Sequence, residues 1–244
     1  MLLSYGLYGR YGYGMGMFFD PTMILVLIGL VLSLAASAMV KGTFAKYSRV
    51  RSMSGMTGAQ AAERILHSAG IYDVSIARVA GNLTDHYDPR SKTLRLSDAT
   101  YASASVAAVG VAAHECGHAI QHQQHYAPLA LRSTLVPAAN LGSSLAWPVF
   151  VVGLIASLPA LTTAGILLFG LAVLFQLVTL PVEINASRRA VGLLESTGVL
   201  GHTENSGVKK VLTAAALTYV ASLAASVLQL LRLIILSGGR RRND

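Results

Sequence analysis

Residues 133–182 read STLVPAANLGSSLAWPVFVVGLIASLPALTTAGILLFGLAVLFQLVTLPV, a run of 50 positions without Asp, Glu, Lys or Arg. A helix needs about 20 apolar residues to cross the hydrocarbon core of a bilayer, so the run is long enough for two crossings. Pro159 and the threonines after it interrupt the aliphatic residues, which predicts a helical hairpin with its break near 158–163. The run therefore indicates a mainly α-helical, polytopic membrane protein.

Two shorter uncharged runs, residues 23–40 and 211–231, flank this hairpin. Each is long enough for one span. The first also resembles the apolar part of a signal peptide, but few basic residues precede it, which favours a span. Basic residues between 41 and 51 place residues 41–132 in the cytoplasm. If residues 211–231 also span, arginines 240–242 lie outside, so either the rule fails at the C-terminus or this helix packs into the protein instead of crossing. Topologies with three and four spans both stay open.

The composition agrees with a membrane protein. Only 12% of the residues are charged and the mean hydropathy is +0.55, whereas soluble domains carry about 25% charged residues. The net charge is +8, and the basic residues gather at the ends of the apolar runs. This placement suits anionic lipid headgroups and argues against a nucleic-acid partner. The single cysteine, Cys116, excludes an intrachain disulfide.

Residues 41–132 are expected to form a small fold with a minor β element. Residues 57–69 predict a helix capped by Thr57 and ended by Gly70. Alternating apolar and polar residues at 74–79 and 94–96 predict short antiparallel strands, separated by a polar turn at 85–89. Ser97 or Asp98 is expected to cap a helix that runs from Ser103 to about His125.

This helix contains His114-Glu115-Cys116-Gly117-His118, an H-E-x-x-H pattern. Residues four apart share a helical face, so both imidazoles can bind one zinc ion. Glu115 lies about 100° round the helix and is expected to act as general base and then general acid on the hydrolytic water. The alternative is two surface histidines beside a routine acid, but the apolar flanks make such polar groups costly to bury without partners. Cys116 faces away and is expected to pack.

A catalytic zinc ion needs a third protein ligand, and the sequence leaves its identity open. His122 lies about 12 Å along the helix from His114, too far for one ion, so His122 and His125 are expected at a wet helix end. The metzincin pattern requires glycine at position 121 and histidine at 124, and both are glutamine here. Glu183 would be returned to the same membrane face by the hairpin. It could equally be a helix-end acid paired with Arg188 or Arg189.

Four segments together resemble the YugP-like family of bacterial membrane zinc metallopeptidases: LTDHYDPRSKTLRLS (83–97), AAHECGHAIQH (112–122), TLPVEINASRRA (179–190) and AAALTYVA (214–221). The resemblance covers about residues 20–235, and the family is similar to the gluzincins, which include thermolysin. It implies a zincin-like core, one Zn²⁺ ion with Glu183 as its third ligand, and an enzyme of the bacterial inner (cell) membrane whose site faces the cytoplasm.

The chain departs from gluzincins at one position. Many of them place an Asp four residues after the ligand Glu, where it orients a zinc-bound imidazole, but Ser187 stands there. The candidates for that role are Asp85, Asp88 and Asn185. A donor to the developing oxyanion is also expected, and the candidates are Tyr219, His86 and His202. The strand Leu94-Arg95-Leu96 is expected to lie at a sheet edge, where it could pair with an extended peptide.

The predicted function is that of a membrane-embedded zinc-dependent metalloendopeptidase acting on unfolded or membrane-proximal polypeptides. One alternative is a non-catalytic, zinc-stabilised membrane scaffold, which needs four protein ligands and no Glu115. Another is a transporter, which predicts ionisable residues within the spans, and the three runs lack acidic and basic residues. The predicted organisation is a Tyr/Gly-rich tail (1–22), a span (23–40), a catalytic segment (41–132), a transmembrane hairpin (133–182), a third-ligand helix and loop (183–210), a spanning or packed helix (211–236) and a basic tail (237–244).

Overall fold

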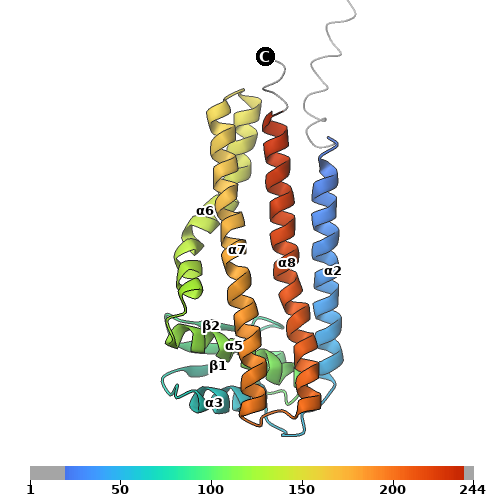
Figure 1. Ribbon diagram of the computed structural model, residues 1–244, viewed down its shortest axis with the longest axis vertical. Helices are drawn as coiled ribbons and strands as arrows, with labels where there is room; N and C mark the ends of the chain where they lie inside the picture. Colours follow the sequence, from blue (N-terminus) through green and yellow to red (C-terminus); the bar gives the residue numbers. More distant parts are fainter. Residues whose placement is uncertain (1–19, 239–244) are drawn as a thin grey trace, which may run out of the picture. The chain divides into compact units, whose positions relative to one another are not determined.

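The computed structural model describes residues 20–238, so most of the two predicted tails lies outside the described residues. The described chain is mainly α-helical with one small sheet, as predicted (Figure 1). In chain order its elements are α2 (Met23–Ser48), α3 (Gly58–Ser68), β1 (Ser75–Val79), β2 (His86–Asp88), β3 (Thr93–Ser97), α4 (Asp98–Tyr101), α5 (Val106–Gln123), α6 (Ala127–Ile155), α7 (Pro159–Ser196) and α8 (His202–Gly238).

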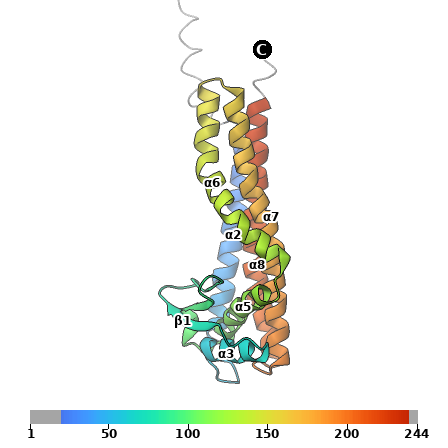
Figure 2. The same ribbon diagram turned by 90° about the vertical axis from the view of Figure 1, so that its left-hand side faces the viewer.

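Four of these helices, α2, α6, α7 and α8, are long and apolar enough to cross a membrane. They include the C-terminal helix, for which the sequence left the question open. The break predicted near 158–163 falls between Ile155 and Pro159, and α6 and α7 lie side by side where this turn joins them (Figure 2). α7 continues without interruption to Ser196, so Glu183 lies inside this helix and not in an element of its own.

The described chain divides into two compact units, and each long helix contributes to both. The first unit comprises residues 20–33, 139–173 and 221–238. Its core is a cluster around Phe150, Leu154 and Leu233. The Arg232 guanidinium is buried there, 3.0 Å from an Asp20 carboxylate oxygen and 5.8 Å above the Trp147 ring. This pairing compensates for part of the cost of removing the charge from water.

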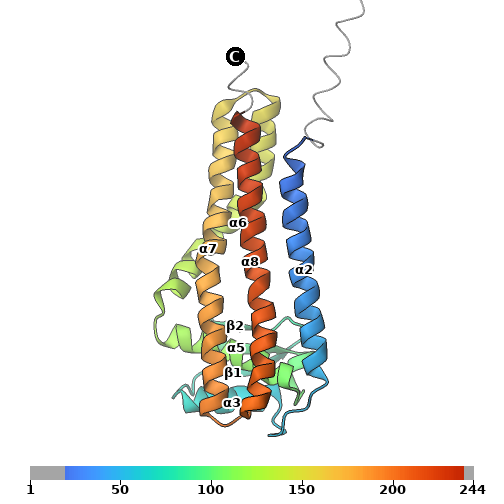
Figure 3. The same cartoon turned by 45° about the vertical axis from the view of Figure 1, so that its right-hand side comes forward.

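The second unit comprises residues 34–138 and 174–220, and it contains the sheet and all the short helices. α3 begins with the predicted cap, in which the Thr57 hydroxyl accepts from the Gln60 N–H and the Gln60 side chain accepts from the Thr57 N–H. It ends before Gly70, whose φ is +72°, a conformation that glycine adopts without strain. Its buried face packs against α5, and the core of this unit extends to α7 and α8 (Figure 3).

The strand order is β1-β3-β2, which corrects two expectations. β1 pairs with β3 in parallel and not antiparallel, because the segment predicted to be only a turn contains β2. β2 forms an antiparallel hairpin with β3, and β1 pairs with the other edge of β3. Leu94 and Leu96 therefore lie on the central strand, where both side chains are fully buried, and the prediction of an edge strand there was wrong. Among described residues, the free edge beside α5 belongs to β2.

The helix that bears the H-E-x-x-H pattern is shorter at its start than predicted. Ser97 and Asp98 begin the separate single-turn helix α4, and Ser97 makes no side-chain cap. α5 begins at Val106, and the Ser105 hydroxyl accepts from the Ala108 N–H. Its other end, at Gln123, lies close to the predicted one.

Candidate metal centre

α5 and α7 come into backbone contact beside the H-E-x-x-H pattern. A Cβ atom on Gly117 would stand 2.7 Å from the Ala186 carbonyl oxygen and 3.1 Å from its Cα, closer than packed atoms tolerate. Only glycine therefore allows this approach. Glu183 lies three residues before Ala186, so the contact brings one turn of α7 against the face of α5 that carries the histidines.

The three predicted metal ligands meet at this contact. His114 Nε2 lies 3.2 Å from Glu183 Oε2, and His118 Nε2 lies 3.6 Å from the same oxygen. The two imidazole rings are perpendicular, with centroids 4.8 Å apart. One donor atom from each of the three residues lies within 4.8 Å of the other two. The structure thus brings together side chains separated by 69 positions in the sequence.

Glu183 has a partner that the sequence analysis missed. Its other oxygen, Oε1, lies 3.1 Å from Arg132 Nη1, and the carboxylate is only 2% exposed. Neither Arg188 nor Arg189 pairs with it, so the helix-end alternative was wrong. Arg132 is the last charged residue before the 50-residue uncharged run, and Glu183 is the first after it. The sequence analysis applied the hairpin argument only to Glu183. Applied to both ends of the run, the same argument would have predicted that Arg132 and Glu183 lie close together.

A buried glutamine holds His118. Gln121 Nε2 donates to the Val182 carbonyl and to Asn185 Oδ1, each at 2.9 Å. Its Oε1 must then face His118 Nδ1, at 3.0 Å. Because this oxygen can only accept, the imidazole proton lies on Nδ1, and the Nε2 lone pair points toward Glu183. Asn185, one of the predicted imidazole partners, acts through Gln121 and not directly.

Ser187 holds the other histidine. Its hydroxyl lies 3.2 Å from His114 Nδ1, at the position where gluzincins carry an Asp. The other two candidates are engaged elsewhere, since Asp85 accepts from the Ser97 N–H and hydroxyl and Asp88 accepts from Arg95, Ser91 and Arg90. The prediction that Asp85 or Asp88 orients an imidazole is therefore not supported by their contacts.

Cys116 packs as predicted. Its thiol donates to the Ala62 carbonyl at 3.6 Å on the side of α5 away from the histidines. Full burial, and then the charge of Glu115, raise the pKa of the thiol well above its usual value. Cys116 therefore stays a neutral packing residue, because only a thiolate ligates a metal.

Two cavities share a border at His114 and Glu183, and one of them also includes His118. A cleft of about 310 Å³, the β2-side cleft, is lined by residues of β2, α5, α6, α7 and α8. A chamber of about 250 Å³, the α2-side chamber, is lined by residues of α2, α5, α7 and α8 and by Leu83 and Asp85, and its α2 residues are apolar. Both are bounded by the same set of polar side chains: Asp85, His114, Glu115, Glu183 and Tyr219.

The other residues singled out in the sequence lie at different distances from the two cavities. Tyr219 lines both cavities, and His86 lines the β2-side cleft, whereas His202 lines neither. His122 is not a free residue at a wet helix end, because its Nδ1 lies 2.9 Å from the Tyr87 hydroxyl and joins β2 to α5. His125 is exposed at the end of α5, as predicted.

The donor set fits a zinc ion with one open position. Ligand atoms about 2.0–2.1 Å from a tetrahedral ion lie about 3.3 Å from one another, and the two Nε2–Oε2 distances are close to this value. Two imidazoles and a carboxylate are typical of catalytic zinc. Burial lowers the pKa of His118, but the facing Glu183 and Glu115 carboxylates raise it more, so the net shift is upward. The same negative charges attract a cation.

Comparison with known proteins agrees with this geometry. Residues 22–238 match the model of a family described as "Putative neutral zinc metallopeptidase". The chain is 47% identical over 222 residues to a Bacillus subtilis (strain 168) protein named "Putative membrane protease YugP", covering 91% of this chain and 99% of that protein. No solved structure matches the chain significantly.

Replacing Gly117 tests the contact between α5 and α7. We expect Gly117→Ala to push the helices apart, to destabilise the protein by about 1–3 kcal/mol and to weaken zinc binding. Thermal unfolding in detergent and zinc competition with a chelator measure the two effects. Gly192→Ala is the matched control, because Gly192 lies on α7 and a Cβ atom there would meet nothing within 4 Å. Equal zinc affinity in Gly117→Ala and wild type would contradict the role of this contact.

Replacing Gln121 tests the hydrogen bond that orients His118. We expect Gln121→Leu to lower zinc affinity about 10- to 100-fold, the usual cost of losing such a partner. Gln123→Leu makes the same chemical change on the same helix at an exposed position and should bind zinc like the wild type. If both variants bind zinc equally well, Gln121 does not orient the ligand.

Proposed function

Since the chain belongs to the neutral zinc metallopeptidase family, we propose that it is a membrane-embedded zinc-dependent endopeptidase. His114, His118 and Glu183 bind the ion, and Glu115 is the general base. The observation that carries the proposal is the convergence of the three donors within 4.8 Å on cavities that Glu115 also lines.

The protein's own groups prepare the ligands. When bound, zinc supplies a Lewis acid that polarises a peptide carbonyl and acidifies water. Gln121 Oε1 accepts from His118 Nδ1, and the Ser187 hydroxyl can accept from His114 Nδ1, which allows both histidines to present Nε2 lone pairs as neutral imidazoles. Arg132 neutralises one Glu183 oxygen and fixes the carboxylate, which leaves the other oxygen to the ion.

Glu115 moves the proton. It is 7% exposed, lines both cavities and lies beside the donors on α5. Its carboxylate accepts a proton from the attacking water, holds it during the attack and delivers it to the leaving amine. Tyr219 borders the same space from α8, where its hydroxyl can donate a hydrogen bond to the oxyanion that develops on the substrate.

The cavities suggest how a substrate lies. A peptide that passes from the β2-side cleft into the α2-side chamber crosses the donors between them. The free edge of β2 offers main-chain pairing, and Tyr87–His122 holds this strand against α5. Such binding requires an extended chain, so the proposed substrate is an unfolded or membrane-proximal polypeptide. The apolar walls of the chamber suit an apolar side chain.

The proposed location of the enzyme is the bacterial inner membrane, and the four candidate spans support it. Basic residues follow the apolar run of α2 and precede that of α8, which favours a cytoplasmic location for this end of both helices. The donors on α5 and Glu183, at the end of the uncharged run, then lie at the cytoplasmic face.

The first experiment compares wild type with Glu115→Gln, using an unfolded protein substrate and a zinc assay. We expect kcat to fall about 100- to 10,000-fold, the contribution of a general acid–base, with zinc retained. Glu195→Gln, an exposed acid on α7, is the control and should cleave normally. Equal cleavage by wild type and Glu115→Gln would contradict the mechanism. Zinc binding without cleavage by the wild type would favour the scaffold, although the described residues offer only three clustered ligands.

Substrate conformation is tested with one disulfide-bonded globular protein in its native form and after reduction and alkylation. We expect the unfolded form to be cleaved at least about 1,000-fold faster, because native proteins expose an unfolded state only at fractions near 10⁻³ or below. Glu115→Gln, run with both forms, corrects for contaminating proteases. Similar rates for the two forms would contradict binding of an extended chain.

A further inference from the structure

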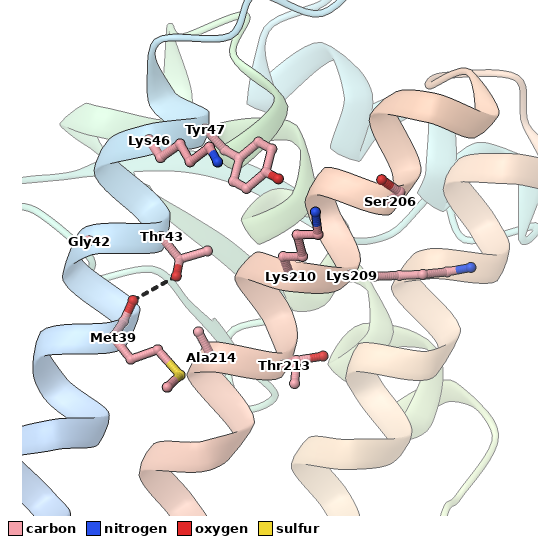
Figure 4. A pocket seen from close by; sticks show the side chains of 10 residues that line it. All are labelled: Met39, Gly42, Thr43, Lys46, Tyr47, Ser206, Lys209, Lys210, Thr213 and Ala214. Atoms are coloured by element: carbon pink, nitrogen blue, oxygen red, sulfur yellow. Dashed lines mark hydrogen bonds between the residues drawn. The ribbon is translucent and has the colours of Figure 1, made fainter.

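A third cavity, of about 680 Å³ and called the basic cleft, lies between α2 and α8. Its volume is within the range of small-molecule sites. α2 contributes Met39, Gly42, Thr43, Lys46 and Tyr47, and α8 contributes Ser206, Lys209, Lys210, Thr213 and Ala214 (Figure 4). All of these residues belong to the second unit, and none lines the cavities at the metal centre.

The cleft carries positive charge without a balancing acid. The Lys46 and Lys210 side chains extend toward the space between the helices, whereas Lys209 points away (Figure 4). Among the described residues, no carboxylate lies within 4.0 Å of these ammonium groups. The Ser206 hydroxyl also lines this end of the cleft, whereas Thr213 lies beside Ala214 (Figure 4). Two ammonium groups with a hydroxyl in the same cleft are complementary to a phosphate.

The polar and apolar residues are separated along the cleft. Lys46 follows the apolar run of α2, and Lys210 immediately precedes the apolar run of α8. Met39 and Ala214 lie toward the apolar side of the cleft (Figure 4). In a membrane the lysines would therefore lie at headgroup level, with Met39 and Ala214 toward the acyl chains.

Gly42 makes room between the two helices. A Cβ atom at this position would meet nothing within 4 Å, so the missing side chain leaves open space. Above it the helices close, since a Cβ on Gly207 would stand 2.7 Å from the Tyr47 ring. The cleft is thus bounded at this end by the contact of Gly207 with Tyr47.

We propose that the basic cleft binds the phosphate headgroup of an anionic glycerophospholipid, with Lys46 and Lys210 on the phosphate and the acyl chains along Met39 and Ala214. The site depends on the membrane location of the chain and not on its peptidase activity. Neighbouring faces of the same helices carry Phe44 and Val211, which line the α2-side chamber. A bound lipid would thus stabilise two helices that form a wall of the candidate active site.

The test is a titration of the full-length protein in detergent with phosphatidylglycerol, with bound lipid counted by native mass spectrometry. We expect the double variant Lys46→Gln/Lys210→Gln to bind about 10- to 30-fold more weakly than wild type, from roughly 1 kcal/mol for each lysine near anionic lipid. The control Lys41→Gln/Arg49→Gln removes two charges from the same end of α2 outside the cleft and should bind almost normally.

A second variant keeps the charge. Gly42→Leu fills the open space without a backbone clash, so it should fold, as checked by thermal unfolding, and should also lose phosphatidylglycerol. Equal losses in both double variants, or unchanged binding in Gly42→Leu, would overturn the proposal in favour of diffuse surface attraction. Inorganic phosphate or glycerol phosphate displacing the lipid at equal concentration would show that the site takes a small phosphate instead. No retained lipid in the wild type would also overturn it.

Discussion

The backbone contact of α5 with α7 at Gly117 is the constraint on which the candidate metal centre depends. A side chain there would meet the Ala186 carbonyl, and the two helices would separate. With glycine, one turn of α7 lies against the histidine face of α5, and a single Glu183 oxygen reaches both imidazoles. The spacing of the histidines places two candidate ligands on one helix, but the third joins them only because this contact is close.

Gln121, Ser187 and Arg132 contact the candidate ligands and set the orientation and charge of their donor atoms. Gln121 Oε1 accepts from His118 Nδ1 and so directs the Nε2 lone pair of that ring inward, while the Ser187 hydroxyl lies against His114 Nδ1. Arg132 occupies the oxygen of Glu183 that faces away from the histidines. In a helix of a largely uncharged region, an unpaired carboxylate would be costly to bury. Arg132 offsets part of that cost, and a cation held by the three donors would offset more of it.

α2 and α8 each line two different cavities. One face of each helix lines the α2-side chamber next to the metal donors, and the other lines the basic cleft. Helical periodicity makes this division possible, because residues three and four apart share a face. The proposed peptide and lipid sites would thus lie on different faces of the same two helices, and this pair would connect bilayer composition to the proposed active site.

The local signals in the sequence determined the helical membrane architecture, the break near Pro159, the cap and end of α3, and the H-E-x-x-H pattern, because each depends on residues close together in the chain. Strand order, the pairing of Glu183 with Arg132 and the roles of Gln121 and Ser187 were decided only by tertiary structure. The alternation at 94–96 indicates a strand, but it cannot reveal that β2 occupies the edge and leaves β3 in the centre. Likewise, Ser187 and His114 are 73 positions apart, and Gln121 is held by residues of α7 more than 60 positions away. Glutamine and serine are also too common for their positions alone to indicate a role.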